Sequence, residues 1–454
     1  VADMQTSQKK MWGDLAALPS DADDDARSAA IQPAVDEFKS FVDYQYEEAE
    51  TRKVAKLAEI DNEIEAAEEP LENQRLNDKR DLVKVEGGTA IKEVKLYSGG
   101  YFKKSLAYFI FGFVILAFSW LAPNSKIGRI LTWIATVLLV YGLVLNIYGI
   151  TMRSIIRARP PITNLYDTVI FITGIAVLLA LALEFFTRKG IGLLMAALTG
   201  VGGMFLSLRY EVKEATDTMD PLQAVLDTNF WLATHVTTIN IGYAAGLLSA
   251  FLGAYYLLKR FLNPLPKVLK SVSGGEPVKS AELFDEPKEK RDLYKTVTNM
   301  NYGIVCFCLF FSLVGTVLGG VWANYSWGRF WGWDPKENGA LMICLWTLVI
   351  LHMRMGGYVR DIGIAVLSIL LGVIVTFSWW GVNNLGVGLH SYGFTEGVWP
   401  ALYVSWAECA FIMACGIPLW WYERVKKRAK KMKRSADKDA AAAAIESGAT
   451  PEGA

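Results

Sequence analysis

Histidine is scarce in this chain of 454 residues, and two of its three histidines are placed to act together. His235 ends the segment Phe230-Trp-Leu-Ala-Thr-His235, and His390 lies within residues 386–393, which are rich in glycine. Neutral imidazole is a common axial ligand of heme iron, and two imidazoles complete a six-coordinate site. Each histidine alone is more simply interpreted as structural. The pair favours a metal-ligand role only if both lie on the same side of the molecule.

A run of tryptophans lies between the two histidines in the sequence. Trp322, Trp327, Trp331 and Trp333 fall within twelve residues, and Asp334-Pro-Lys-Glu follows directly. Tryptophan also collects in the headgroup zone of membranes, which is the plainer explanation. However, such belts are scattered over helix ends, whereas these indoles are close together and interspersed with glycine. Aromatic faces and closely approaching backbone suit a planar ligand, so this segment is predicted to be its platform, with Asp334 included.

Three further ionisable residues are candidates. His352 lies inside an apolar segment and next to Arg354, where an ionisable group is costly and often functional. It is either a second ligand for the same metal compound or a hydrogen-bonded helix contact. Arg157 and Arg159 lie in a loop where positive charge is unexpected. They are candidates for carboxylate binding, and contact with lipid headgroups is the alternative.

The chain that must position these residues is predicted to be an all-α polytopic membrane protein. Half of its residues are hydrophobic, and about nine segments approach the 20 apolar residues needed to cross a bilayer. These segments are residues 105–123, 127–150, 168–187, 190–208, 234–258, 300–321, 338–355, 360–382 and 400–422.

Charge predicts the orientation of these spans. The basic tail Arg424–Arg434 and the Lys-rich linker 259–295 are expected to be cytoplasmic. Loops 209–233, 322–337 and 383–399 then lie outside, so that His235, His390 and the tryptophans share one face. The alternation also places residues 1–100 outside, and we expect a segment upstream of Val1 to direct them there.

Five regions are expected from composition. They are a charged, helical extramembrane segment (1–100), a first transmembrane group (101–258), a cytoplasmic linker (259–298), a second, tryptophan-containing transmembrane group (299–422) and a basic cytoplasmic tail (423–454). The first region has a net charge of about −10. In it we expect a helical hairpin interrupted at Pro33, Pro70 and Gly87-Gly88, or a partly disordered spacer.

Several classes of chemistry find no support. The five cysteines lie in apolar segments without a Cys-x-x-Cys pair, which argues against a disulfide framework or a zinc site. No phosphate-binding loop, catalytic nucleophile or nucleic-acid-binding pattern is present. Any reacting groups are therefore expected to belong to a ligand and a partner.

Together these motifs resemble the CcsA (ResC) family of cytochrome c assembly proteins. Residues 327–337 resemble the family's tryptophan-rich signature, residues 351–354 its transmembrane histidine motif, and residues 231–235 and 388–393 its two external histidine motifs. Residues 159–166 resemble its first external loop, with Asp167 where glutamate is expected. The resemblance spans residues 105–422.

The resemblance implies a function in which heme b (iron protoporphyrin IX) crosses the membrane and is presented outside. His235 and His390 would be the axial ligands, and His352 would meet heme on its way. Apocytochrome c would then receive it through the thiols of its CxxCH motif. A CcsB (ResB)-like membrane partner, or a missing fused segment, would supply a second membrane histidine. The expected location is the cytoplasmic membrane, with the heme site on its outer side.

Three alternatives stay open at this point. The chain could be a CcmC-like heme exporter or a CcmF-like lyase subunit of the same superfamily, a membrane electron-transfer protein with permanent heme, or a transporter with an aromatic gate. Whether the chain is itself part of a heme lyase enzyme, which cytochromes it serves, and what supplies the reductant are not encoded in recognisable motifs.

Overall fold

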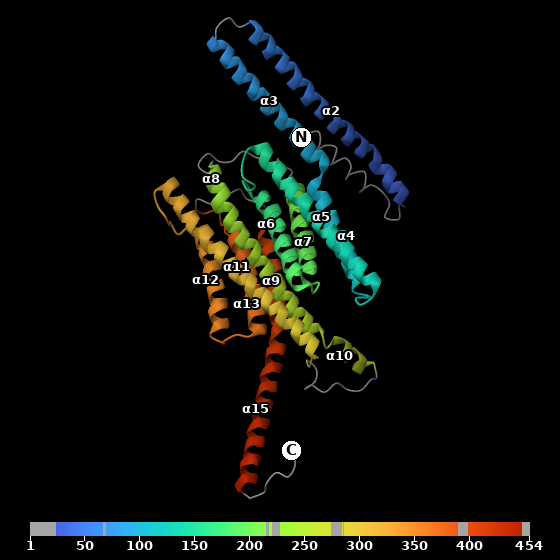
Figure 1. Cartoon of the computed structure of the whole chain (residues 1–454), viewed down its shortest axis with the longest axis vertical. Helices are drawn as coiled ribbons and strands as arrows, with labels where there is room; N and C mark the ends of the chain where they lie inside the picture. Colours follow the sequence, from blue (N-terminus) through green and yellow to red (C-terminus); the bar gives the residue numbers. More distant parts are fainter. Residues whose placement is uncertain are drawn as a thin grey trace. The chain divides into compact units, whose positions relative to one another are not determined.

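The chain folds into α-helices, as the computed structural model in Figure 1 shows. The structure describes residues 24–66, 70–214, 218–219, 228–273, 284, 286–388 and 398–446. Within those ranges it contains no β-strand, and nine helices are long and apolar enough to cross a membrane. The predicted all-α, multi-pass membrane architecture is therefore confirmed.

Two compact units make up the chain, and each is described by itself. Unit 1 comprises Val1–Gly174 and Gly200–Ala233, and unit 2 comprises Ile175–Thr199 and Thr234–Ala454. In unit 1 lie α2 (Asp24–Ala66), α3 (Pro70–Gly99), α4 (Tyr101–Ser119), α5 (Lys126–Arg157) and α8 (Asn229–Trp231). Helices α6 (Leu165–Thr187) and α7 (Ile191–Glu214) contribute a segment to each unit. In unit 2 lie α9 (Thr237–Leu262), α10 (Leu265–Val272), α11 (Lys288–Trp327), α12 (Pro335–Met355), α13 (Asp361–Thr376), α14 (Val398–Ala414) and α15 (Gly416–Glu446).

The described part of the charged N-terminal region is helical, as predicted. Helices α2 and α3 form a hairpin, and ion pairs join them from Lys79 to Glu63 at 3.0 Å and from Arg80 to Asp61 at 2.8 Å. The expected interruptions at Pro33 and Gly87-Gly88 were wrong, because both lie inside helices. Proline and glycine weaken a helix without ending it when its neighbours favour helix, and the many Glu, Lys, Ala and Leu residues here do so.

Close packing in the membrane part of unit 1 depends on small residues. A Cβ added to Gly112 would lie 2.9 Å from Leu139, and one added to Gly142 would lie 2.8 Å from Phe109. The hydroxyl of Ser105 donates to the carbonyl of Gly142 at 2.8 Å. Helices α4 and α5 can therefore approach closely and share a buried hydrogen bond.

Helix α9 is central to unit 2, where it packs against both α11 and α13. A Cβ added to Gly315 of α11 would lie 2.9 Å from the Cα atom of Ile239, so this glycine allows the two backbones to meet. Deeper in the unit, Ser249 donates to Asn301 at 2.6 Å, and Asn301 donates to Ser368 at 3.0 Å. Polar side chains thus join three helices where no water would satisfy them.

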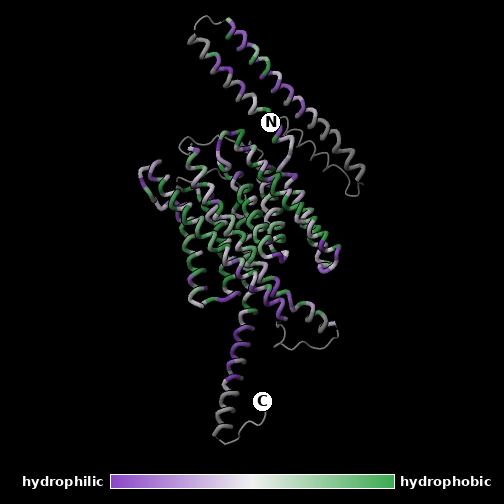
Figure 2. The backbone as a smooth tube through the Cα atoms, viewed as in Figure 1, coloured by the Kyte–Doolittle hydropathy of each residue, from purple (hydrophilic) through white to green (hydrophobic). Residues whose placement is uncertain are grey.

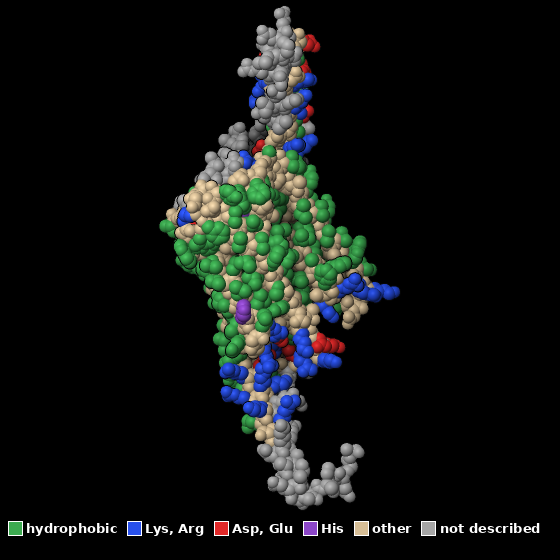
Figure 3. Space-filling view, turned by 60° about the vertical axis from the view of Figure 1, so that its left-hand side comes forward, with side chains coloured by type: hydrophobic (Ala, Val, Ile, Leu, Met, Phe, Trp, Pro, Cys, Tyr) green, Lys and Arg blue, Asp and Glu red, His purple; other side chains and the backbone are tan. Residues whose placement is uncertain are grey.

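In unit 2 the bounds of some helices differ from those predicted by hydropathy. Helix α11 begins at Lys288, twelve residues before the predicted span, because its first turns are charged and project beyond the apolar part. The predicted last span is divided between α14 and α15. Helix α15 is hydrophilic in its middle part (Figure 2) and ends at Glu446. Figure 3 shows Lys and Arg side chains gathered around the first part of α15, beside the apolar surface.

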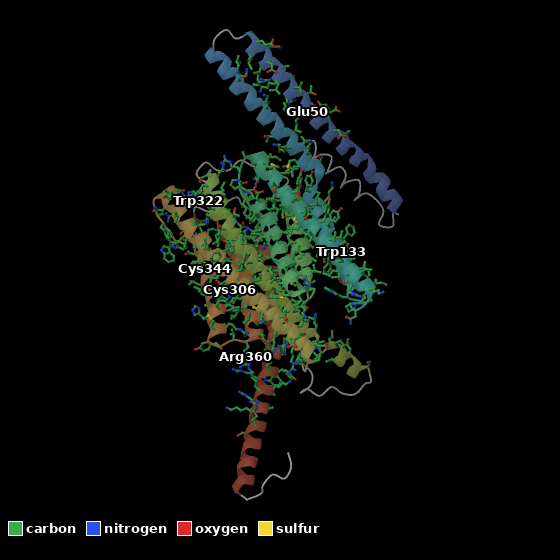
Figure 4. All side chains as sticks on the ribbon, viewed as in Figure 1. Glu50, Trp133, Cys306, Trp322, Cys344 and Arg360 are labelled. Atoms are coloured by element: carbon green, nitrogen blue, oxygen red, sulfur yellow. The ribbon has the colours of Figure 1, made fainter. Side chains whose placement is uncertain are left out.

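Unit 2 has two distinct ends. Figure 4 shows Trp322 toward one end and Arg360 toward the other, with Cys306 and Cys344 between them. We call the first the aromatic end, defined by His235, residues 319–334 and the π-helical turn η4 (Phe377–Gly381). The two ends matter because the predicted functional residues are divided between them.

Candidate functional site

His235 lies in a π-helical turn, η2 (Leu232–Val236), that leads into α9. Its Nδ1 atom lies 2.8 Å from the carbonyl oxygen of Gly315. Because a carbonyl can only accept a hydrogen bond, the ring proton is assigned to Nδ1. In the neutral imidazole the lone pair is then on Nε2, which is the arrangement that suits a metal ligand.

The ring of His235 is held against α11. A Cβ added to Gly319 would lie 2.6 Å from Cε1 of the imidazole, so glycine is the residue that leaves room for it. The ring centroids of His235 and Trp322 are 5.7 Å apart, with their planes inclined at 62°. The structure therefore brings together His235 and Trp322, the first tryptophan of the predicted platform. Their role in binding a ligand stays a prediction.

Asn240 is a residue that the sequence reasoning missed. Its amide nitrogen donates to the carbonyl of Val236, the last residue of the π-helical turn, at 2.8 Å. Such turns shift the hydrogen-bond ladder by one residue and are frequent at functional sites. This contact supports the turn that carries His235. No spacing in the sequence would have revealed it.

The tryptophan loop connects α11 with α12. Trp327 ends α11, and Gly328 closes it in the left-handed region at φ 69°. The loop continues to Trp333, a non-glycine residue with φ 58°, which is 69% exposed. The rings of Trp331 and Trp333 are 6.1 Å apart and nearly perpendicular, at 88°. A positive φ at a non-glycine residue is energetically unfavourable, and such strained residues cluster at functional sites. Here the strained residue carries a large exposed indole.

Glu337 fixes the shape of this loop. Its carboxylate accepts from the backbone N–H groups of Gly332 at 2.8 Å and of Asp334 at 3.1 Å. Asp334 is 5% exposed and caps α12 by accepting from the N–H of Lys336 at 2.9 Å. The two carboxylates therefore organise the backbone. Asp334 was predicted to bind the ligand, and the contact just given is structural.

His390 lies outside the described residues. The last described residue before it is Gly388, which has φ +89°. A Cβ on Gly388 would collide with the carboxylate of Asp334 and would lie 2.9 Å from Cδ of Pro335. Two residues of chain span at most about 7 Å. The backbone that leads to His390 thus reaches the start of α12, immediately after the tryptophan loop.

A second pair of tryptophans also lies at the aromatic end. Trp379 and Trp380 belong to η4, are 6% and 7% exposed, and have ring centroids 5.4 Å apart. The carbonyl of Trp379 accepts from Nζ of Lys336 at 3.0 Å. Two adjacent tryptophans just before residues 383–399 could have indicated a second aromatic cluster. They fall instead within the predicted span 360–382.

His352 lies at the opposite end of unit 2 from the tryptophan loop. It is 17 residues into α12 after Pro335, which corresponds to about 25 Å along the helix. Its Nδ1 is 2.8 Å from the carbonyl of Leu348, and its side chain is exposed. Nearby, Arg354 pairs with Asp361 at 3.6 Å. His352 is therefore not part of the cluster around His235.

Arg153 and Arg157, in the last turns of α5, belong to a buried network in unit 1. Arg153, which is 2% exposed, bonds through Nε to Asp167 at 2.9 Å, and Arg157 bonds to the other oxygen of that carboxylate at 2.6 Å. Asp167 also accepts from the N–H and the hydroxyl of Thr163, at 3.1 and 2.8 Å. Arg153 reaches onward to the backbone carbonyl of Thr218 at 2.6 Å.

Arg159 differs from the two buried arginines. It lies on the surface, and its contact with the side chain of Asn229 is long, at 3.5 Å. Of the two arginines predicted to bind a carboxylate ligand, Arg157 is already engaged with Asp167, and Arg159 is half-buried.

Comparison with known proteins supplies a family for this arrangement. Residues 162–390 match the family described as cytochrome C assembly protein. The cytochrome c biogenesis protein CcsA of Chlorella vulgaris is 32% identical over 264 residues, which cover 54% of this chain and 82% of that protein. The proteins of the same name from Trieres chinensis and Prochlorococcus marinus are each 30% identical, covering 61% and 60% of this chain and 89% and 85% of their own lengths.

Proposed function

Because the chain belongs to the CcsA family of cytochrome c biogenesis proteins, we propose that its aromatic end binds heme and presents it to apocytochrome c. The observation that carries the proposal is the position of His235. Its imidazole is anchored through Nδ1, leaves the lone pair on Nε2, and lies beside Trp322. A histidine fixed in this tautomer next to aromatic rings suits an iron porphyrin.

The proposed ligand is heme b, with His235 and His390 as axial ligands of its iron. The indoles that would hold the ring belong to the predicted platform of Trp322, Trp327, Trp331 and Trp333. Support for including His390 comes from Gly388, whose contact with Asp334 brings the chain to within two residues of His390 beside the tryptophan loop.

The proposed reaction joins heme to a CxxCH motif of apocytochrome c. Each cysteine S–H would add across one vinyl group, so that a C–S bond forms, the hydrogen goes to the neighbouring carbon, and no net oxidation occurs. In this scheme the chain contributes positioning, because the thiols belong to the apocytochrome. The chain would thus be one part of a holocytochrome c synthase complex.

His352 is proposed to act earlier, where heme enters from the cytoplasmic side. Its Nδ1 donates to Leu348, so the lone pair is again on Nε2, and its side chain is exposed on the helix surface. An exposed imidazole in a membrane helix favours a second ligand from another chain. A CcsB (ResB)-like protein is the proposed partner. The basic start of α15 supports a cytoplasmic C-terminus, and the proposed location is the cytoplasmic membrane with the heme site on its outer side.

Heme propionates are the proposed ligands of the external arginines. Arg157 is engaged by Asp167 and Thr163, and Arg159 is the second candidate for this role. A forked guanidinium is well matched to a carboxylate.

The test is to purify the chain with its co-purifying partners and record the visible absorption spectrum. We expect a Soret band in the wild type, its loss in His235→Gly and His390→Gly, and partial recovery with added imidazole. An apocytochrome peptide with CxxCH should be captured, whereas an AxxAH peptide should not. Absence of a Soret band from well-folded wild type would overturn the proposal. Bound heme that cannot be transferred to apocytochrome would favour the electron-transfer alternative.

A further inference from the structure

The segment Asp334-Pro-Lys-Glu337 makes contacts that point away from a direct ligand role. Glu337 holds the N–H groups of the tryptophan loop, and Asp334 caps α12. Lys336 extends in another direction and donates through Nζ to the carbonyl of Trp379, at 3.0 Å. Each of these side chains is therefore bonded to backbone, and together they reach two different connections of unit 2.

The hydrogen bond of Lys336 is part-buried, so forming it requires partial desolvation of a charged ammonium group. Its partner Trp379 lies in the π-helical turn η4, where the carbonyl of Phe377 bonds five residues ahead to Val382 at 2.9 Å. A charged donor gives a stronger hydrogen bond than a neutral one. The lysine therefore attaches this irregular turn firmly to the start of α12.

Two further contacts attach the same stretch of chain to α12. The hydroxyl of Ser378 donates to the carbonyl of Gly339 at 2.9 Å. At the far side, Gly388 lies against Asp334 and Pro335. The stretch from residue 378 to residue 388 is thus held at both ends by the first residues of α12.

We propose that Lys336 is a positioning residue that holds the segment leading to His390 against the tryptophan loop. The inference rests on the proposed function for its purpose, but the attachment itself is a property of the protein without heme. Gly386 and Gly388 have positive φ angles of 67° and 89°, and glycine itself has little conformational preference at these two positions. A ligand delivered from such a segment binds more tightly when the segment is held in place beforehand.

The first experiment measures the segment in heme-free protein. Trp380 and Leu385 lie within residues 378–388 and are cleavage sites for chymotrypsin. We expect Lys336→Met to raise the rate of cleavage there by roughly tenfold or more, as for loss of a hydrogen bond to a charged group. Lys336→Arg, which keeps a cationic donor, should stay close to wild type. Equal cleavage rates in wild type and Lys336→Met would overturn the inference.

The second experiment uses heme as the probe. Lys336→Met should bind less heme, with a weakened Soret band that changes toward that of His390→Gly, and added imidazole should restore the band. A general loss of structure would not be repaired by imidazole. If the wild type itself shows no heme band, the proposed function fails, while the cleavage experiment still decides the role of Lys336.

A second variant keeps the inference testable if Lys336→Met does not fold. Gly388→Ala places a Cβ against Asp334 and should detach the other end of the segment, with the same rise in cleavage. Its matched control is Gly357→Ala, which also has a positive φ, of 72°, but has no atom within 4 Å of the added Cβ. Equal cleavage in both alanine variants would count against the inference.

Discussion

The buried arginines of unit 1 and His235 of unit 2 differ in the partners that bind their side chains. The arginines are bound by a carboxylate, whereas His235 is bound by an uncharged backbone carbonyl. Arg153 and Arg157 are charged, and they share one carboxylate, that of Asp167, which is fully buried. His235 is held by an uncharged carbonyl through one ring nitrogen. A buried charge must be compensated within the protein, so such a residue reports on structure. A neutral imidazole can be anchored at one nitrogen and retain a lone pair at the other, so it can serve a ligand.

The largest expected effect comes from breaking the arginine network. Asp167→Ala leaves two buried guanidinium groups without their shared carboxylate and should lower the free energy of unfolding by about 3–5 kcal/mol. Thermal unfolding of the purified protein measures this. The fraction that remains folded should bind heme with an unchanged spectrum. A destabilisation below about 1 kcal/mol would show that Asp167 is not the structural centre of this loop.

The next largest effect is expected from a variant that keeps His235 but displaces its imidazole ring. In Gly319→Ala the new methyl group would meet Cε1 of the imidazole, so heme affinity should fall by about 10–100-fold, as for other losses of ligand orientation. Heme titration of the purified variant measures it. The matched control is Gly303→Ala in the same helix, where the added Cβ meets no atom within 4 Å. Equal affinities in the two variants would contradict the proposed orientation of His235.

His352 tests whether the two ends of unit 2 act separately. Because it lies about 25 Å along α12 from the tryptophan loop, His352→Ala should leave the affinity for heme added to purified protein within about twofold. The amount of heme loaded in cells should fall by about tenfold. The ratio of heme to protein after purification, compared with the titration, separates the two quantities. A large loss of affinity in the titration would contradict separate sites.

The smallest expected effect on stability is that of Arg159. Its contact with Asn229 is long, at 3.5 Å, and lies in an exposed setting, so Arg159→Gln should change the free energy of unfolding by less than about 0.5 kcal/mol. Arg157→Gln, its partner in the comparison, should destabilise the protein by several times that amount because it breaks a buried pair. Lower heme affinity in Arg159→Gln without destabilisation would support propionate binding, and unchanged affinity would argue against it.

The residues that could be predicted from sequence are those whose signal is local. The nine apolar segments required only length and composition, and they are confirmed as helices. Charge near the membrane ends then predicted that His235 would share a face with the tryptophans, and it lies beside Trp322. The start of α11 and the extension of α15 were missed because hydropathy detects only apolar segments. It does not distinguish a charged helical turn from a charged loop.

The amino-acid sequence by itself determined the helical membrane architecture, the family, and the identity of the rare imidazoles and clustered indoles, because these follow from residue type and spacing. Only the tertiary structure decided which partner each polar side chain has. It assigned the proton of His235 through Gly315, paired Arg157 with Asp167, and directed Lys336 to Trp379. Many of these hydrogen bonds join residues that are far apart in the chain. Whether their atoms come within about 3 Å of each other depends on the angle and distance at which the helices pack.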